Sequence, residues 1–103
     1  MALADILAGK VLADLPMALH ADLSVNGEAT LRLIAHVRAG GIAALLIGSN
    51  ANLQAFGLAQ FAAAVEIAAE AARHGPVVLG IGPELGRTLD QAPLIERAGL
   101  ANL

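Results

Sequence analysis

The stretch AGGIAALLIGSN, residues 39–50, decides the fold, because a glycine pair stops one amphipathic pattern and an apolar run follows at once. Glycine tolerates the left-handed backbone that ends many helices, so Gly40 and Gly41 predict a helix end. Residues 42–47 contain no polar side chain, which is typical of a strand covered on both faces. Similar apolar-rich runs stand at residues 12–19 and 77–81. Because amphipathic stretches separate these runs, the sequence predicts βα units and a parallel sheet.

The segments around the three runs predict the remaining elements. Residues 2–7 favour a short leading helix. Pro16 has no backbone N–H for a sheet, so the first strand is expected to be short or to start near that proline. Asn26 is a suitable N-cap for a helix over residues 27–39. A second helix is expected over residues 58–74, where apolar side chains recur at helical spacing.

Side-chain spacing also predicts helix faces and the start of the last helix. In the first of these two helices, one face is expected to hold Leu31, Ile34, Ala35 and Arg38. In the second, the apolar residues at helical spacing are Phe61, Val65, Ala68, Ala69 and Ala72. The last helix is expected to start near Asp90, because Pro93 would be tolerated only in the first turn. Residues 100–103 have the pattern of the first residues of a fourth strand.

Together these patterns predict the α/β fold class and a partial (β/α)8 TIM barrel, with about three βα units and the start of a fourth strand. Residues 1–103 are expected to form a single incomplete α/β domain. Residues 1–10 would hold the leading helix, and residues 11–103 the barrel portion.

Composition excludes several classes of function. The 103 residues are 57% hydrophobic, above the roughly 45–50% that is usual for soluble domains, so a large apolar surface must be buried. The net charge of −3 and six scattered Lys and Arg residues offer no basic patch, so no nucleic-acid partner is expected. Cysteines are absent, which excludes disulfides and thiolate catalysis. No apolar run is long enough for a membrane span, and Asp5 and Lys10 do not suit a signal peptide, so a cytoplasmic protein without a membrane partner is expected.

The order of the segments resembles the amino-terminal part of the dihydrodipicolinate synthase and N-acetylneuraminate lyase family. The likeness covers roughly residues 11–103 and rests on short motifs at matching spacing. These motifs are LPMAL at 15–19, DLSVN at 22–26, AGGI at 39–42, LIGSN at 46–50, PVVLGIG at 76–82 and IERAG at 95–99. The resemblance implies that residues 11–103 correspond to the amino-terminal portion of a (β/α)8 barrel.

Members of that family bind pyruvate or a related 2-oxo acid as a Schiff base on a lysine, and they form or cleave carbon–carbon bonds. Their lysine lies on a later strand than any in this sequence, whereas Lys10 precedes the first strand and matches no motif. The resemblance therefore implies a fragment of an aldolase-type lyase that is inactive alone, with no catalytic residue and no cofactor assigned to this chain. The expected partners are a 2-oxo acid such as pyruvate and either the missing barrel segment or a second copy.

The resemblance also points to a substrate-binding loop after the second strand. Family members carry a glycine, two hydroxyl residues, a glycine and a glutamate there, and this chain has GSNAN at 48–52. Gly48 matches the first glycine and Ser49 the first hydroxyl residue, which with nearby backbone N–H groups would bind a substrate carboxylate. Asn50 replaces the second hydroxyl residue, and Ala51 and Asn52 replace the glycine and the glutamate, so a divergent subgroup with another substrate is an alternative. A simple turn is the alternative, since Ser and Asn are common turn formers.

The histidines and Glu84 are further candidates for functional residues. His20 and Glu84 are expected near carboxyl ends of strands, where barrels build their active sites. His36 is expected on the surface, and His74 suits the negative end of a helix. The three histidines lack metal-ligand spacing, so no metal site is expected.

The motif GIGPELG at 80–86 superficially resembles a dinucleotide-binding loop, but its proline removes a backbone donor and its glutamate would repel a pyrophosphate. A noncatalytic module that assembles through its sheet edges is the alternative function.

Overall fold

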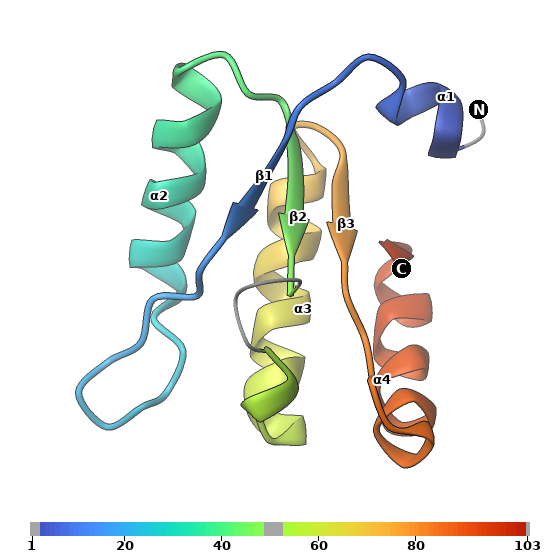
Figure 1. The fold of residues 1–103 in the computed structure, drawn as a ribbon. Coiled ribbons are helices and arrows are strands. Elements are labelled where there is room, and N and C mark those ends of the chain that lie inside the picture. The colour runs from blue at the N-terminus through green and yellow to red at the C-terminus, as the bar shows by residue number, and fades with distance from the viewer. Residues whose placement is uncertain (1–2, 49–52, 103) are drawn as a thin grey trace.

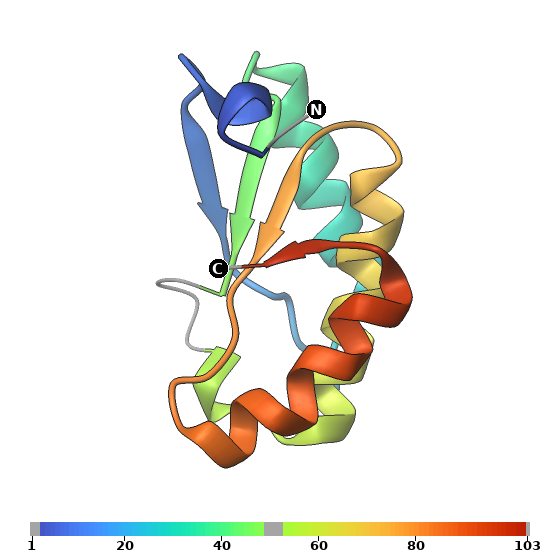
Figure 2. The same cartoon turned by 90° about the vertical axis from the view of Figure 1, so that its right-hand side faces the viewer.

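A computed structural model describes residues 3–48 and 53–102 of the chain. Its four strands form one parallel sheet in the order β1-β2-β3-β4. They are β1 (Leu12–Leu15), β2 (Ala44–Ile47), β3 (Val77–Leu79) and β4 (Ala101–Asn102). The helices are α1 (Leu3–Leu7), α2 (Gly27–Ala39), α3 (Leu58–Ala72) and α4 (Leu85–Ala98), with a 3-10 turn, η1 (Leu53–Ala55), before α3. Figures 1 and 2 show α2, α3 and α4 on one side of the sheet, so the predicted α/β class with parallel βα units is confirmed.

The strands are shorter than the apolar runs that predicted them. β1 ends directly before Pro16 instead of starting near it, because that residue has no N–H for a ladder. β2 begins at Ala44, two residues later than the apolar run. β3 ends at Leu79, although the Gly80 N–H still donates to the Ile47 carbonyl at 2.8 Å.

The start and end of α2 follow the sequence signals. The Asn26 side chain caps the helix by accepting a hydrogen bond from the Ala29 N–H at 3.0 Å. At the other end, Gly41 has the left-handed backbone with φ of 100°. Gly40, predicted to share that role, has φ of −78° and so keeps helical geometry. A single left-handed glycine therefore ends the helix.

The start of α4 was predicted wrongly. The helix begins at Leu85 rather than near Asp90, so Pro93 lies in its interior. Pro93 and Leu89, one turn apart, are both exposed, so the carbonyl that loses its helical hydrogen bond lies on the solvent side. The first turns are also held from outside the helix, because the Arg87 Nη1 donates to the Phe56 carbonyl at 3.0 Å. This contact with a distant segment favours the earlier start of the helix.

Replacing Pro93 with alanine is expected to stabilise the protein by about 1–3 kcal/mol, because alanine restores the missing hydrogen bond and raises helix propensity. Chemical unfolding followed by circular dichroism would measure the change. The exposed Glu96 of the same helix gives a control, since Glu96→Ala should change stability by less than about 0.5 kcal/mol. Loss of stability in Pro93→Ala would contradict the interior position of the proline.

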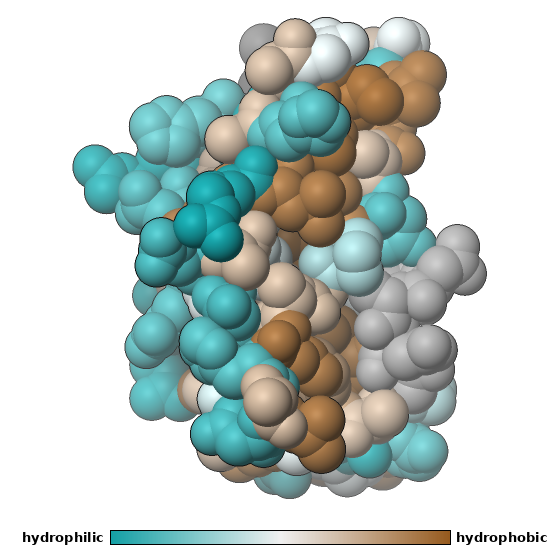
Figure 3. Space-filling model, turned by 90° about the vertical axis from the view of Figure 1, so that its left-hand side faces the viewer, coloured by the Kyte–Doolittle hydropathy of each residue, from teal (hydrophilic) through white to brown (hydrophobic). Residues whose placement is uncertain are grey.

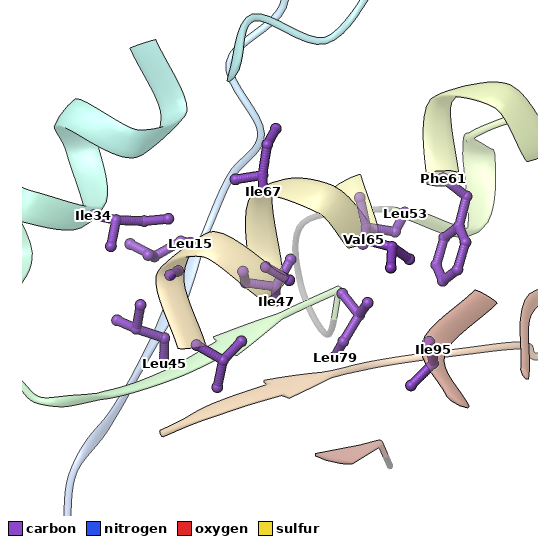
Figure 4. Packing of buried hydrophobic residues seen from close by; sticks show 13 residues of the cluster. Leu15, Ile34, Leu45, Ile47, Leu53, Phe61, Val65, Ile67, Leu79 and Ile95 are labelled. Atoms are coloured by element: carbon purple, nitrogen blue, oxygen red, sulfur yellow. The ribbon is translucent and has the colours of Figure 1, made fainter. Parts of the chain in front are cut away.

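The hydrophobic core lies between the sheet and the three helices, as Figure 4 shows. On α3, Phe61, Val65 and Ala68 are buried as predicted, whereas Ala69 is half-buried and Ala72 is exposed. Ala64, Ile67 and Ala71 complete the buried face instead. Because these residues follow each other at three- and four-residue spacing, the helix is turned slightly from the predicted orientation.

The buried face of α2 is also turned from the predicted one. Ile34 is buried, but Ala35 is exposed and Thr30 occupies the core-facing position. Burial of a polar side chain is tolerated because the Thr30 hydroxyl accepts from the Ala18 N–H at 3.0 Å and donates to the Asn26 carbonyl at 2.8 Å. This pair of hydrogen bonds also ties the segment after β1 to the start of α2. Within the described part of the chain, no helix is both long and apolar enough to cross a membrane.

Candidate functional site

The backbones of Gly48 and Gly80 pass very close to each other where β2 and β3 end. A Cβ atom on Gly80 would lie 3.2 Å from the Gly48 carbonyl oxygen, and one on Gly48 would lie 3.3 Å from the Gly80 nitrogen. Gly48 also has φ of 101°, a backbone conformation that residues with a side chain rarely adopt. The parallel register aligns Ile47 with Leu79, so the two glycines follow at the same edge of the sheet. Glycine is therefore strongly favoured at Gly48 and allows the close approach at Gly80.

A hollow of about 270 Å³ lies at this edge of the sheet. On one side, the buried Gln91 of α4 accepts a hydrogen bond from the Gly82 N–H at 2.8 Å through its Oε1 atom. The lining consists of apolar, amide and backbone groups from Gly48, Leu53, Gly80, Ile81, Gly82, Pro83 and Gln91. Because these lining residues carry no titratable side chain, they could hold a small group but could not move a proton. Any chemistry here would need groups from elsewhere.

The structure places only part of the predicted substrate-binding loop. Gly48 lies at the end of β2 and lines the hollow. Ser49 and Asn50 lie outside the described residues, so their predicted contacts with a substrate stay predictions.

His20 and Glu84 do not meet near the hollow. Glu84 is the exposed N-cap residue of α4, and its carboxylate pairs with the Arg87 Nε at 3.2 Å. His20 is exposed in the loop between β1 and α2, which Figure 1 shows on the other side of α3 from the start of α4. In that loop the Ser24 hydroxyl and the Ser24 N–H donate to Asp22, which lowers the pKa of the Asp22 carboxyl. These contacts build a turn rather than a pair of catalytic groups.

Comparison with known proteins supports the architecture. No family model matches the chain, and no curated protein matches it in sequence. Among solved structures, it is similar to YagE, a prophage protein of the dihydrodipicolinic acid synthase family from E. coli K12 in complex with pyruvate. The TM-score is 0.80 at 22% identity, covering 91% of this chain and 33% of YagE. A putative dihydrodipicolinate synthetase from Pseudomonas aeruginosa gives a TM-score of 0.78 at 18% identity, with 90% and 33% covered.

Over this length, the fold is that of the dihydrodipicolinate synthase family. The chain spans about a third of the length of these structures. The predicted partial barrel is thus confirmed as a fold, and its strand ends are the place where barrels of this kind build their sites.

Lys10 lies at the opposite end of the sheet from the hollow. It precedes β1, and its Nζ donates to the Ile6 carbonyl of α1 at 2.6 Å. It lines a separate cavity with residues 41–43, which lead into the amino end of β2. The chain contains no other lysine. No group of three potential metal-ligating side chains occurs among the residues that the structure describes.

The sequence did not identify Gly80 and Gln91 as part of this site. Gly80 carried a signal, since it directly follows an apolar run and matches a strand-end motif. No sequence signal marks Gln91 as a site residue, because its burial depends on where α4 begins. The Gln91 side chain also accepts the hydrogen bond of the Gly82 N–H, so that donor is not free for a phosphate. A dinucleotide-binding role for residues 80–86 is therefore disfavoured.

Proposed function

We propose that this chain provides the carboxylate-binding part of a pyruvate- or 2-oxo-acid-dependent lyase of the aldolase type. The hollow that Gly48 and Gly80 line at the strand ends carries the proposal, because a small ligand could lie against these two residues without meeting a side chain from either. The bound pyruvate in YagE, whose fold this chain shares over a third of its length, supports a 2-oxo acid as the ligand class. Gly48, Ser49 and Asn50 are the residues proposed to bind the substrate carboxylate.

The reaction needs an amine that the described residues do not place near the hollow. A lysine amine would add to the keto carbon, and loss of water would give an imine that withdraws electrons from the neighbouring carbon–carbon bond. Lys10 is at the wrong end of the sheet for this role. The lysine is therefore proposed to come from a further barrel segment, and the chain in isolation is proposed to be inactive.

The surface beside β1 supports the proposal that further βα units complete the barrel. Among the described strands, β1 pairs only with β2, and β4 pairs only with β3, so each has one open edge. Figure 3 shows apolar residues in a band along the side of the molecule where α2 and β1 lie. Partly buried side chains from these elements include Leu12, Ala13, Leu33 and Val37. An open strand edge beside apolar side chains suits added βα units, from another barrel segment or from a second copy.

The same open edges favour a second candidate function. A noncatalytic module could assemble through them without any substrate. It differs from the lyase in needing neither a lysine at the strand ends nor a bound carboxylate, so imine formation separates the two.

Borohydride trapping with pyruvate, followed by intact mass measurement, tests the lyase proposal. We expect no adduct on this chain and a covalent adduct on the protein extended through the adjoining coding sequence. Lys10→Arg in the extended protein should keep the adduct, since the proposed amine lies elsewhere. Ser49→Ala should require about tenfold more pyruvate for half-maximal trapping, because one hydrogen bond to a charged group is lost. Absence of an adduct from both proteins would overturn the lyase proposal and favour the assembly module.

A further inference from the structure

A second groove, of about 320 Å³, runs between α2 and α3. Apolar side chains of Leu31, Ile34 and Ala35 from α2 and Ala71 from α3 form much of its lining. The candidate site at the strand ends shares no lining residue with it. The groove includes the last turn of α2 and the end of α3, so it approaches the opposite edge of the sheet.

Arg38 brings a positive charge into this groove. Its Nη1 donates to the Ala71 carbonyl at 2.7 Å, one of the last carbonyls of α3, where a cation is favoured by the helix dipole. Its Nε and Nη2 atoms are buried and have no hydrogen-bond partner. Burial lowers the pKa of Arg38, yet a guanidinium stays charged at neutral pH. Two donors of a charged group thus lack an acceptor.

The other charged groups of the groove do not supply that acceptor. Glu70 is the only acidic residue in the lining, and its carboxylate pairs with the Arg73 Nη1 at 3.1 Å. The His74 side chain is exposed, and its backbone N–H donates to the Ala71 carbonyl at 3.1 Å. The groove therefore combines apolar walls with one cation that has unused donors.

We propose that the groove between α2 and α3 binds a small aliphatic carboxylate, with its alkyl chain against Leu31 and Ala35 and its carboxylate on Arg38. The fork of a guanidinium matches two carboxylate oxygens, so Nε and Nη2 would gain the acceptors they lack. Both atoms are buried in the free protein, and Nη2 lies beside Gly75, so the proposal requires the guanidinium to turn toward the groove when the ligand enters. The apolar walls favour an alkyl chain over a free inorganic anion.

Titration of the full chain with octanoate, followed through its backbone amide NMR signals, tests this site. We expect saturable shifts that centre on residues 31–38 and 70–74. Octanol, which has the same chain length without the charge, should bind at least tenfold more weakly. Equal binding of the two probes, or no saturable shift with octanoate, would overturn the proposal.

Two variants test the residues. Arg38→Gln should weaken octanoate binding at least tenfold, whereas Arg32→Gln should leave it unchanged, since Arg32 is an exposed arginine of the same helix that pairs with Glu28 at 3.0 Å. Ala35→Phe should also abolish binding by filling the groove while leaving the arginine in place, so it replaces Arg38→Gln if that variant does not fold. Unchanged binding in a folded Arg38→Gln or Ala35→Phe variant would overturn the site.

Discussion

Replacing Gly48 with alanine is expected to lower the free energy of unfolding by about 2–5 kcal/mol. Left-handed backbone costs a residue with a Cβ about 1–2 kcal/mol, and Gly48 has φ of 101°. The new methyl group would also lie 3.0 Å from the Leu53 Cδ1 and 3.3 Å from the Gly80 nitrogen. Overpacking of this kind costs about a further 1–3 kcal/mol. Urea unfolding followed by circular dichroism would measure the sum.

Gly41 provides a matched control for the backbone term. Its φ is 100°, nearly the same as at Gly48, but an added Cβ would have no neighbouring heavy atom within 4 Å. Gly41→Ala should therefore cost only about 1–2 kcal/mol. The difference between the two variants isolates the close approach of β2 and β3. Equal losses would mean that the strand ends relax freely and that Gly48 is not needed for the shape of the site.

Local signals in the sequence were sufficient to predict several element ends. Asn26 caps α2 through its own side chain, and the left-handed Gly41 ends the same helix. Each of these effects depends on a residue and its immediate neighbours, so it can be recognised without the rest of the fold. The parallel order of the strands followed from the alternation of the patterns for the same reason.

Contacts between distant segments account for what the sequence could not predict. Pro93 marks a helix start by local rules, but Arg87 binds the Phe56 carbonyl and Gln91 binds the Gly82 N–H, so the helix begins earlier. Phe56 is 31 residues from Arg87 and Gly82 is 9 residues from Gln91, so both bonds reach beyond a single helical turn. Similar reasoning applies to the faces of α2 and α3, whose small rotations depend on how the helices pack on the sheet.

The candidate site was only partly predictable for the same physical reason. Gly48 could be identified from its place in a family-like loop, but its need to be glycine depends on Gly80 of the neighbouring strand. That contact depends on the register between Ile47 and Leu79, which the sequence does not specify by itself. The roles of Ser49 and Asn50 rest on the sequence alone, so the trapping experiment carries their test.

Truncation of Phe61 to alanine is expected to cost about 3–5 kcal/mol, the range found for buried aromatic side chains. Phe61 is fully buried and stands at the start of α3, in the same cluster as Leu53 and Leu79 (Figure 4). Leu53 also lines the hollow, so the cavity left by the ring would loosen one wall of the candidate site. Urea unfolding would give the loss of stability, and the trapping assay on the extended protein should show weaker pyruvate binding.

The variant Leu58→Ala is the control for Phe61→Ala, because it introduces alanine into the same helix without removing a buried side chain. Its side chain is 53% exposed, so Leu58→Ala should cost less than about 1 kcal/mol. If the two variants lost similar stability, the packing of α3 on the sheet would be looser than the structure indicates. A large loss in Phe61→Ala with unchanged trapping would instead show that the Leu53 wall tolerates movement. Under the proposed function, the substrate would then depend little on the position of the Leu53 side chain in the lining of the hollow.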